Sequence, residues 1–511
     1  MAKILFVQKE IVPIGIETLS SMLAQAGHQT RLIYYDDPYS NTSFSLGNSL
    51  RLYERFKNFL ANTIEREKPD IVGFSTFTTD YHWALDAAAF IKKRFALPVI
   101  FGGCHVTMVP EEVIEEPVVD MVCIGEGEHA AVALLDAIRD RKGFDAVPNL
   151  WFKRDGVVVK NPLAPLITDL DALPLPDKQI AQGVAGNSYV LMGSRGCPYR
   201  CTYCSNNVYA KLYRDWGKVR FRSVENILHE LEVYLRQHHG QVKRIEIMDD
   251  VVAVNNTRLR ELCEGIQQRT GLPYSCFLHP NLVNEESIQI LKATGCYWLK
   301  IGVQSASEDN RRKHLLRPEK NSQIRAVAEW CHRHGLDFSF DHIFSLPCDT
   351  EQDLIDSVTF YNETRPRIIN YIGLVYLPKT RIVDDAVAKG LLTEADVKNI
   401  NQGQHVTAMA SNVARSQGAT ESDRRMRVLM GRVAYLYSLI SFRSQATVAR
   451  LIASGFLEDP APISSLKIVA AKFIAKFTAN QFYIYMSVIG RLLSAPFRRK
   501  FFLSANAGQR A

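Results

Sequence analysis

Short apolar segments alternate with helix-like segments along the first 144 residues, and this alternation restricts the fold more than any other feature. Strand-like runs occur at 4–7, 31–35, 70–75 and 97–102, with amphipathic stretches such as 15–27 and 81–95 between them. The pattern predicts a doubly wound, Rossmann-like α/β domain, in which helices cover both faces of a parallel sheet. Such sheets bind ligands at the carboxyl ends of their strands, where the expected loops contain Ser75, Thr76, Gly102, Gly103, Thr107, Gly125 and Glu126.

A second alternating series begins after a proline-rich connector at 145–187. Its strand-like runs lie at 189–192, 244–248, 274–278, 298–303 and 337–344. Repeated strand–helix units of this kind predict a full or partial (β/α) barrel over residues 188–400, with its chemistry at the carboxyl-terminal rim. Residues 401–511 are expected to be mainly helical.

Composition limits the setting in which the protein works. The 511 residues include ten cysteines, too few for a disulfide scaffold, and the amino terminus does not have the pattern of a signal peptide. We therefore expect a cytoplasmic protein with free thiols. The net charge of +7 belongs to the tail, because residues 461–511 carry eight Lys or Arg and no acidic residue. Without a basic stripe on the body of the protein, no nucleic-acid partner is expected.

Three of the cysteines are clustered directly after the first predicted barrel strand. Cys197, Cys201 and Cys204 have the spacing C-x-x-x-C-x-x-C. Three thiolates from one loop can hold a four-iron cluster and leave one iron open to another molecule. A zinc site would usually need a fourth ligand nearby, and none follows before His229. Zinc and a redox disulfide at Cys201/Cys204 remain alternatives at this stage.

The cysteine motif, with Tyr203 before its last cysteine, resembles the signature of radical S-adenosylmethionine (SAM) enzymes. The resemblance implies a 4Fe-4S cluster whose open iron is chelated by SAM, and reductive cleavage of SAM to a 5′-deoxyadenosyl radical. It also implies an external low-potential electron donor.

Three later segments extend the likeness. The segment 245–255 resembles the family's second-strand region and places Asp249 and Asp250 at the rim, while 291–308 places Gln304 and Ser305 near SAM. The segment 344–350 (FSLPCDT) resembles a Gly-Leu-Pro-Gly-Glu-Thr motif but departs from it at three positions. The separate cysteines at 263, 276, 296, 331 and 348 are expected to be small buried side chains.

Beside this motif, the glycine-rich loops of the first domain are similar to those of the cobalamin-binding domain that precedes many radical SAM proteins. The seven loop residues given above are therefore candidates for corrinoid contact. The Asp-x-His-x-x-Gly motif, which supplies a lower axial histidine to cobalt elsewhere, is absent. His105 follows the glycine pair, and packing or a hydrogen bond suits it better than cobalt ligation.

The last region adds a basic amphipathic pattern at 464–503, whose longest charge-free stretch, 477–490, is shorter than the ~20 residues of a spanning helix. It favours peripheral membrane contact or a lid over the active site.

The full hypothesis is a class B-like radical methyltransferase that methylates an unactivated carbon of a small, hydrophobic substrate. The alternatives are oxidative cyclisation, as in the similar anaerobic magnesium-protoporphyrin ester cyclases, and a non-catalytic iron–sulfur or zinc protein. Methylthio transfer is disfavoured, because the amino-terminal half has only Cys104 and Cys123.

Overall fold

The first sheet is the doubly wound sheet that the alternation predicts. The computed structural model describes residues 1–36, 49–182, 184–238, 240–404, 421–479 and 501–505. Five parallel strands form the centre of the sheet in the order β2-β1-β3-β4-β5: β1 (Lys3–Lys9), β2 (Gln29–Tyr35), β3 (Ile71–Ser75), β4 (Val99–Gly102) and β5 (Met121–Cys123). The strand order reverses between β1 and β3, and this reversal opens a crevice at their carboxyl ends.

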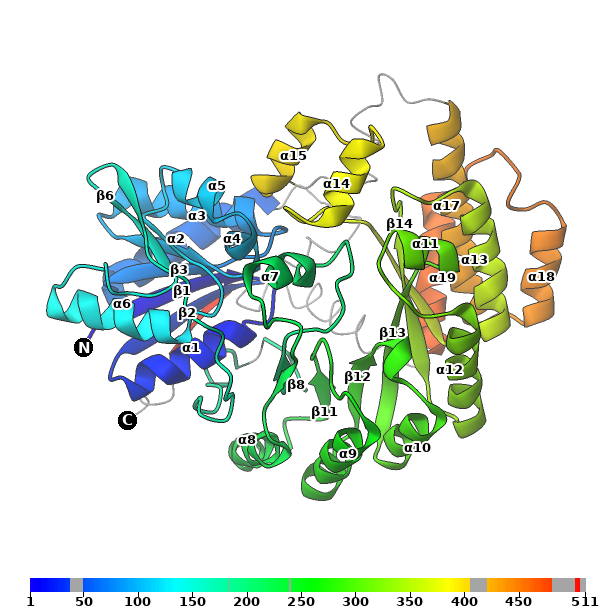
Figure 1. Ribbon diagram of the computed structural model, residues 1–511, viewed down its shortest axis with the longest axis horizontal. Helices are drawn as coiled ribbons and strands as arrows, with labels where there is room; N and C mark the ends of the chain where they lie inside the picture. The colour runs from blue at the N-terminus through cyan, green and yellow to red at the C-terminus, as the bar shows by residue number, and fades with distance from the viewer. Residues whose placement is uncertain (37–48, 183, 239, 405–420, 480–500, 506–511) are drawn as a thin grey trace.

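Alternate side chains of β1 fill two separate cores. Leu5 and Val7 belong to one cluster, and Ile4 and Phe6 to the other. Helices α2 (Ser49–Glu67) and α3 (Tyr81–Arg94) pack together, as do α1 (Ile14–Gln25) and α6 (Glu128–Asp140) (Figure 1). The short helices α4 (Cys104–Met108) and α5 (Pro110–Glu115) follow β4.

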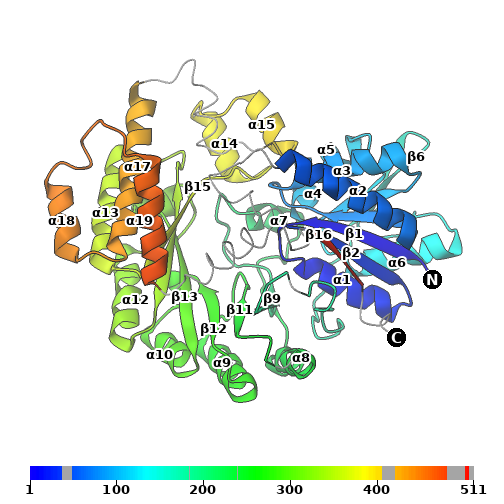
Figure 2. The same ribbon diagram turned by 180° about the vertical axis from the view of Figure 1, so that it is seen from behind.

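Three antiparallel strands extend this sheet beyond the predicted pattern. The hairpin of β6 (Leu150–Arg154) and β7 (Val157–Lys160) adds to β5, although we assigned these residues to the connector. At the other edge, β16 (Phe501–Ala505) pairs with β2. This strand lies within a region that was expected to be mainly helical, and Figure 2 shows it beside β2.

The second sheet is an open, six-stranded parallel sheet, so the partial form of the predicted barrel is confirmed. Its order is β15-β14-β13-β12-β11-β8, and its two edge strands, β8 and β15, are not paired with each other. The strands are β8 (Ser188–Leu191), β11 (Arg244–Ile247), β12 (Tyr274–Leu278), β13 (Cys296–Gln304), β14 (Phe338–Phe344) and β15 (Ile368–Gly373).

Five helices cover the outer face of this sheet (Figure 1): α8 (Val224–Gln237), α9 (Asn256–Thr270), α10 (Glu285–Ala293), α12 (Asn321–His334) and α13 (Glu351–Thr364). Side-chain caps begin several of them, such as Ser223 of α8, which accepts a hydrogen bond from Asn226 N. The loops at the carboxyl ends of the strands carry the ribbon of β9 (Ser194–Arg195) and β10 (Arg220–Phe221), with α7 (Asn206–Leu212), the 3₁₀ turn η1 (Pro280–Leu282) and α11 (Glu308–Lys313).

The remaining helices follow β15. Helices α14 (Arg381–Ala388) and α15 (Glu394–Asn401) lie between the two sheets' ends, as Figure 1 shows. Helix α17 (Glu421–Ile440) packs on α13 and beside β15, α18 (Gln445–Ala453) packs on α13, and α19 (Ser465–Thr478) packs on α17. No helix in the described ranges is long and apolar enough to cross a bilayer.

Candidate active site

The three clustered cysteines lie on one loop between β9 and α7. Gly196 precedes them with φ +92°, and a Cβ there would come within 2.7 Å of the carbonyl oxygen of Trp216. The loop is fixed in its middle, because Thr202 N donates to Leu315 O at 3.2 Å and Thr202 Oγ1 donates to His314 O at 2.7 Å. Cys201 is buried, whereas Cys197 and Cys204 are half-buried.

The surroundings of these thiols disfavour their deprotonation in the absence of a bound metal. Burial, with smaller contributions from the neighbouring Asp250 and the other cysteines, raises the pKa of Cys197 to about 12 and that of Cys204 to about 11. Thiolates at these positions therefore need a cationic partner, which a bound metal cluster supplies. The described residues contain no group of three His, Cys, Asp or Glu that could hold a single metal ion.

Arg317 brings a buried positive charge to the loop. Its Nη1 lies 3.7 Å from Cys201 Sγ and 3.2 Å from the hydroxyl of Tyr203. The same guanidinium donates to Glu319 Oε1 at 2.6 Å and to Gly302 O. Tyr203, a predicted cofactor residue, is therefore held against Cys201 by a residue that the sequence did not suggest.

The two predicted aspartates have different surroundings. Both oxygens of Asp249 accept from Gly193 N, at 2.9 and 3.0 Å, and burial raises its pKa to about 6. Asp249 thus fixes the turn before the cysteine loop. Asp250 accepts from Asn206 Nδ2 at 3.0 Å and is close enough to the cysteines to affect their titration.

The ends of β13 and β14 have unusual backbone. Gln304 has φ +68° and Ser345 has φ +64°, a left-handed conformation that few residues other than glycine adopt. Ser305 is buried, and its hydroxyl accepts from Ser307 N at 3.3 Å. The roles of Gln304 and Ser305 in SAM binding stay predictions.

The inner face of the barrel sheet is polar near its floor. Lys300 Nζ lies 3.2 Å from Glu246 Oε2, and Asn370 Nδ2 donates to Asp341 Oδ1 at 3.0 Å. Nearer the carboxyl ends of the strands, Met248 and Ile372 are 40% and 63% exposed. The strand residues that alternate with these belong to the core under the outer helices.

The first domain contains a cavity of about 200 Å³ at the carboxyl edge of its sheet. Apolar side chains of β1, α1 and α6 form most of its wall. Five of the seven predicted corrinoid residues line it: Ser75, Gly102, Gly103, Gly125 and Glu126.

Thr76 and Thr107 are not in the lining but hold its loops. Thr76 N donates to Gly102 O at 2.8 Å, and Thr107 Oγ1 accepts from Gly125 N at 3.0 Å. Gly103 has φ +93°, and a Cβ there would come within 2.7 Å of the Thr76 backbone. Only glycine therefore allows this close approach of the two loops.

The carboxylate of Glu126 joins the two domains. Its Oε1 accepts from Arg195 Nη1 at 3.0 Å and from Arg220 Nη1 at 2.8 Å, and its Oε2 accepts from Ile167 N at 2.7 Å. Arg195 also donates to Glu128 Oε1 at 2.6 Å. Glu126 can therefore meet a corrinoid chiefly through its backbone.

His105 is not among the residues that line the cavity. It is fully buried, with Nδ1 3.1 Å from Thr78 Oγ1 and its ring against Tyr81. Burial lowers its pKa to about 3. This is the packed, hydrogen-bonded histidine that the sequence favoured over a cobalt ligand.

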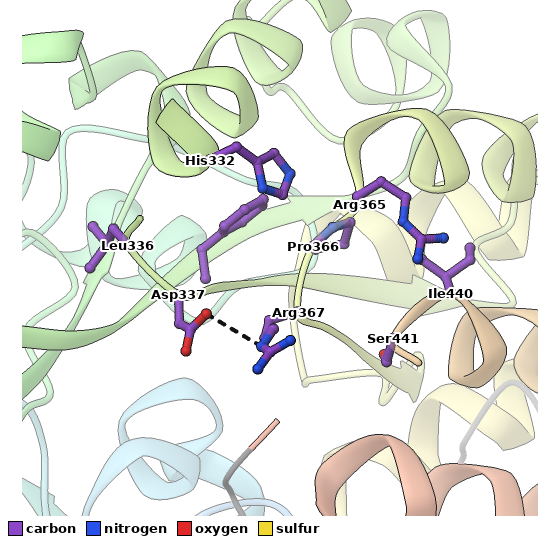
Figure 3. Close-up of a pocket in the computed structure, with 9 residues that line it drawn as sticks. His332, Leu336, Asp337, Arg365, Pro366, Arg367, Ile440 and Ser441 are labelled. Atoms are coloured by element: carbon purple, nitrogen blue, oxygen red, sulfur yellow. Dashed lines mark ion pairs between the residues drawn. The ribbon is translucent and has the colours of Figure 1, made fainter. Parts of the chain in front are cut away.

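A separate cavity of about 280 Å³ lies at the amino ends of β14 and β15, away from the cysteine loop (Figure 3). Basic side chains there bind carbonyl groups where helices end: His332 contacts Thr364 O at 2.9 Å, and Arg367 contacts Thr478 O at 3.4 Å. The last carbonyl groups of a helix lack partners within the helix, so these contacts give both residues a structural role.

The comparisons with known proteins agree with the two-part architecture. The B12 binding domain family matches residues 4–135, and the radical SAM superfamily matches residues 191–361. This chain is a cobalamin-binding radical SAM enzyme. The cofactors of this family, cobalamin, SAM and a 4Fe-4S cluster, are those that the sequence predicted.

Relatives of this cobalamin-binding radical SAM enzyme have different reactions. An uncharacterized methyltransferase of Pyrococcus horikoshii is 28% identical over 74% of this chain and 79% of its own. The anaerobic magnesium-protoporphyrin IX monomethyl ester cyclase of Synechocystis is 23% identical over 64% of each chain. The structure of OxsB with aqua-cobalamin has a TM-score of 0.66 at 16% identity and covers 98% of this chain and 82% of that one, which shows a shared fold.

Both cofactors fit residues that the structure brings together. Three thiols on one loop suit a cluster with an open iron, and Arg317 beside Cys201 offers a charge to a carboxylate ligand. The apolar cavity with a glycine rim suits part of the corrinoid. Arg195 and Arg317 had no local sequence signal, because their partners lie far away in the chain: 69 residues separate Arg195 from Glu126, and 116 separate Arg317 from Cys201.

Proposed function

We propose that this enzyme methylates an unactivated carbon of a small amphipathic molecule. Bound together, the cluster and SAM supply a hydrogen-abstracting radical, and cobalamin supplies a methyl group. The observation that carries the proposal is the direct contact between the loops of the two cofactor domains, through Arg195, Glu126 and Glu128. This contact supports a substrate position between the radical source and the methyl donor.

The residues of the barrel refine the expected substrate. The proposed hydrophobic character is supported at the rim by exposed Met248 and Ile372. Deeper on the inner face, Lys300, Asp341 and Asn370 offer hydrogen bonds, so we expect a polar group at one end of the substrate. Asp249 and Thr202 keep the loop around the cluster fixed while the substrate binds.

The test uses anaerobically reconstituted enzyme, methyl-labelled SAM and small-molecule extract fractions. Methylation transfers the label to a product and releases 5′-deoxyadenosine. The ester cyclase relative makes oxidative cyclisation the second candidate, and a product that loses hydrogen and carries no label would replace methylation with it. The Cys201→Ala variant is the control, since it should form neither product nor 5′-deoxyadenosine.

A peripheral membrane contact is proposed for α19. Leu466, Val469 and Ile474 of this helix are 74%, 43% and 44% exposed, and the chain has no acidic residue from 461 onward. Residues 480–500 of the predicted amphipathic segment lie outside the described ranges. Sedimentation with phosphatidylglycerol vesicles tests the contact: Leu466→Glu should release the enzyme, and equal binding of variant and wild type would contradict it.

A further inference from the structure

The cysteine loop comes to the surface at two residues. Pro198 and Arg200 are exposed, and they flank Cys197 and Cys201 in the chain. These positions give the shortest covalent path from solvent to the buried sulfur of Cys201. The cluster that this loop would hold must receive an electron from outside the protein for each cleavage of SAM.

Unpaired positive charges gather around this surface. Thr202 O accepts from Ile382 N at 3.1 Å, which places α14 directly on the loop. Lys211 Nζ donates to Lys379 O at 3.3 Å, just before α14, and Lys389 follows the same helix. Within the described part of the chain, Arg200, Lys211 and Lys389 form no ion pair with a carboxylate.

Two of the nearby acidic groups are already engaged. Asp309 pairs with Arg312 and Lys313, both at 2.8 Å, and Asp385 lies 4.0 Å from Arg381. Lys313, Arg381 and Lys389 all act electrostatically on His314, whose carbonyl binds Thr202. These cations belong to the cysteine loop or to segments that contact or follow it, and we call them the basic collar: Arg200, Lys211, Lys313, Arg381 and Lys389.

Three exposed apolar side chains belong to the same segments of the chain. Leu316, Val387 and Leu391 are 37%, 38% and 39% exposed. Leu316 also has φ +53°, a costly conformation for a leucine, directly after the residue that binds Thr202. An apolar centre with a charged rim is the usual composition of a transient protein interface.

We propose that the basic collar docks a small acidic redox protein that delivers the electron to the cluster. The donor's flavin or iron–sulfur centre loses one electron and the cluster gains it, so no other reactant is needed. Opposite charges would accelerate encounter and orient the donor over Arg200. The proposal depends on the cluster at the three cysteines but not on methylation or on the identity of the substrate.

The test measures the rate of cluster reduction by stopped-flow absorbance with reduced bacterial flavodoxin as the probe. Arg200→Glu and Lys389→Glu should each slow reduction at least tenfold at low ionic strength, and Arg200→Lys should keep the wild-type rate. Reduction by dithionite, a small molecule, should be unchanged in all variants and shows that the cluster is intact. Arg55→Glu is the matched control, because Arg55 is an exposed cation on α2 without an ion pair among the described residues.

Two results would overturn the proposal. One is wild-type enzyme that dithionite reduces but flavodoxin and an acidic ferredoxin do not. The other is reduction by flavodoxin that is equally fast in the collar variants and in Arg55→Glu. A collar variant that neither flavodoxin nor dithionite reduces has lost its cluster. In that case the conservative variant Arg200→Lys is compared with the wild type instead, and reduction by flavodoxin at the wild-type rate is the expected result.

Discussion

At the scale of single residues, Asp80 gives the protein a pH-dependent stability. Burial raises the pKa of its carboxyl group from 3.8 to about 7, although Phe77 N donates to it at 2.7 Å. A carboxyl group whose pKa is raised on folding stabilises the folded state most below pH 4, and this contribution is lost as the pH rises toward 7. The upper limit of the loss is about 4 kcal/mol.

Asp80→Asn should therefore be relatively more stable at pH 8 than at pH 5, because the amide keeps the acceptor and removes the buried charge. Thermal unfolding of variant and wild type at both pH values measures the difference. Asp384→Asn, at an exposed position on α14, should show no such dependence. An equal shift in Tm for both variants would refute the assignment.

The contacts of Arg317 lead to a second prediction at the scale of single residues. Its guanidinium serves Cys201, Tyr203, Glu319 and Gly302 at once, and a lysine cannot reproduce this fork. Arg317→Lys should lower the iron retained after anaerobic reconstitution severalfold while far-ultraviolet circular dichroism stays unchanged. Full iron content in the variant would show that the contact with Cys201 is incidental.

At the scale of elements, a larger side chain on α6 would fill the cavity of the first domain. Ala131 lines it, so Ala131→Phe should weaken cobalamin binding at least tenfold and leave cluster absorbance unchanged. His129→Phe adds the same ring to an exposed position of α6 and should bind cobalamin normally. Equal cobalamin retention in both variants, measured by absorbance after gel filtration, would place the corrinoid elsewhere.

Elements could be predicted where local pattern determines them. Four of the five central strands of the first sheet, five of the six strands of the second sheet and its five outer helices follow hydrophobic periodicity, and the cysteine spacing is itself local. Strands β5 and β15 were not predicted. Strand β16 could not be predicted, because its pairing with β2 joins Phe501 to Tyr35 across most of the chain. The hairpin of β6 and β7 falls in the predicted connector, because its place in the first sheet depends on the pairing of β5 with β6.

At the scale of the whole molecule, buried ion pairs hold the two cofactor domains together. The side chains of Arg195, Glu126 and Glu128 are 22%, 12% and 7% exposed, so the removal of Arg195 leaves two nearly buried carboxylates with less compensation. Loss of one partner of a buried pair costs about 3 to 5 kcal/mol. By contrast, Lys379 and Glu111 form their domain contact at 42% and 49% exposure, where an ion pair contributes little.

Arg195→Gln should therefore lower the Tm and speed limited proteolysis within the connector, whereas Lys379→Gln should change neither. The double variant Arg195→Gln/Glu128→Gln should recover part of the lost stability, because it removes one of the uncompensated charges. Small-angle X-ray scattering would then show a larger radius of gyration for Arg195→Gln alone. If Arg195→Gln and Lys379→Gln behave alike, the domains are joined chiefly by the connector and by apolar packing, and the contact that supports our proposed function is not what sets their arrangement.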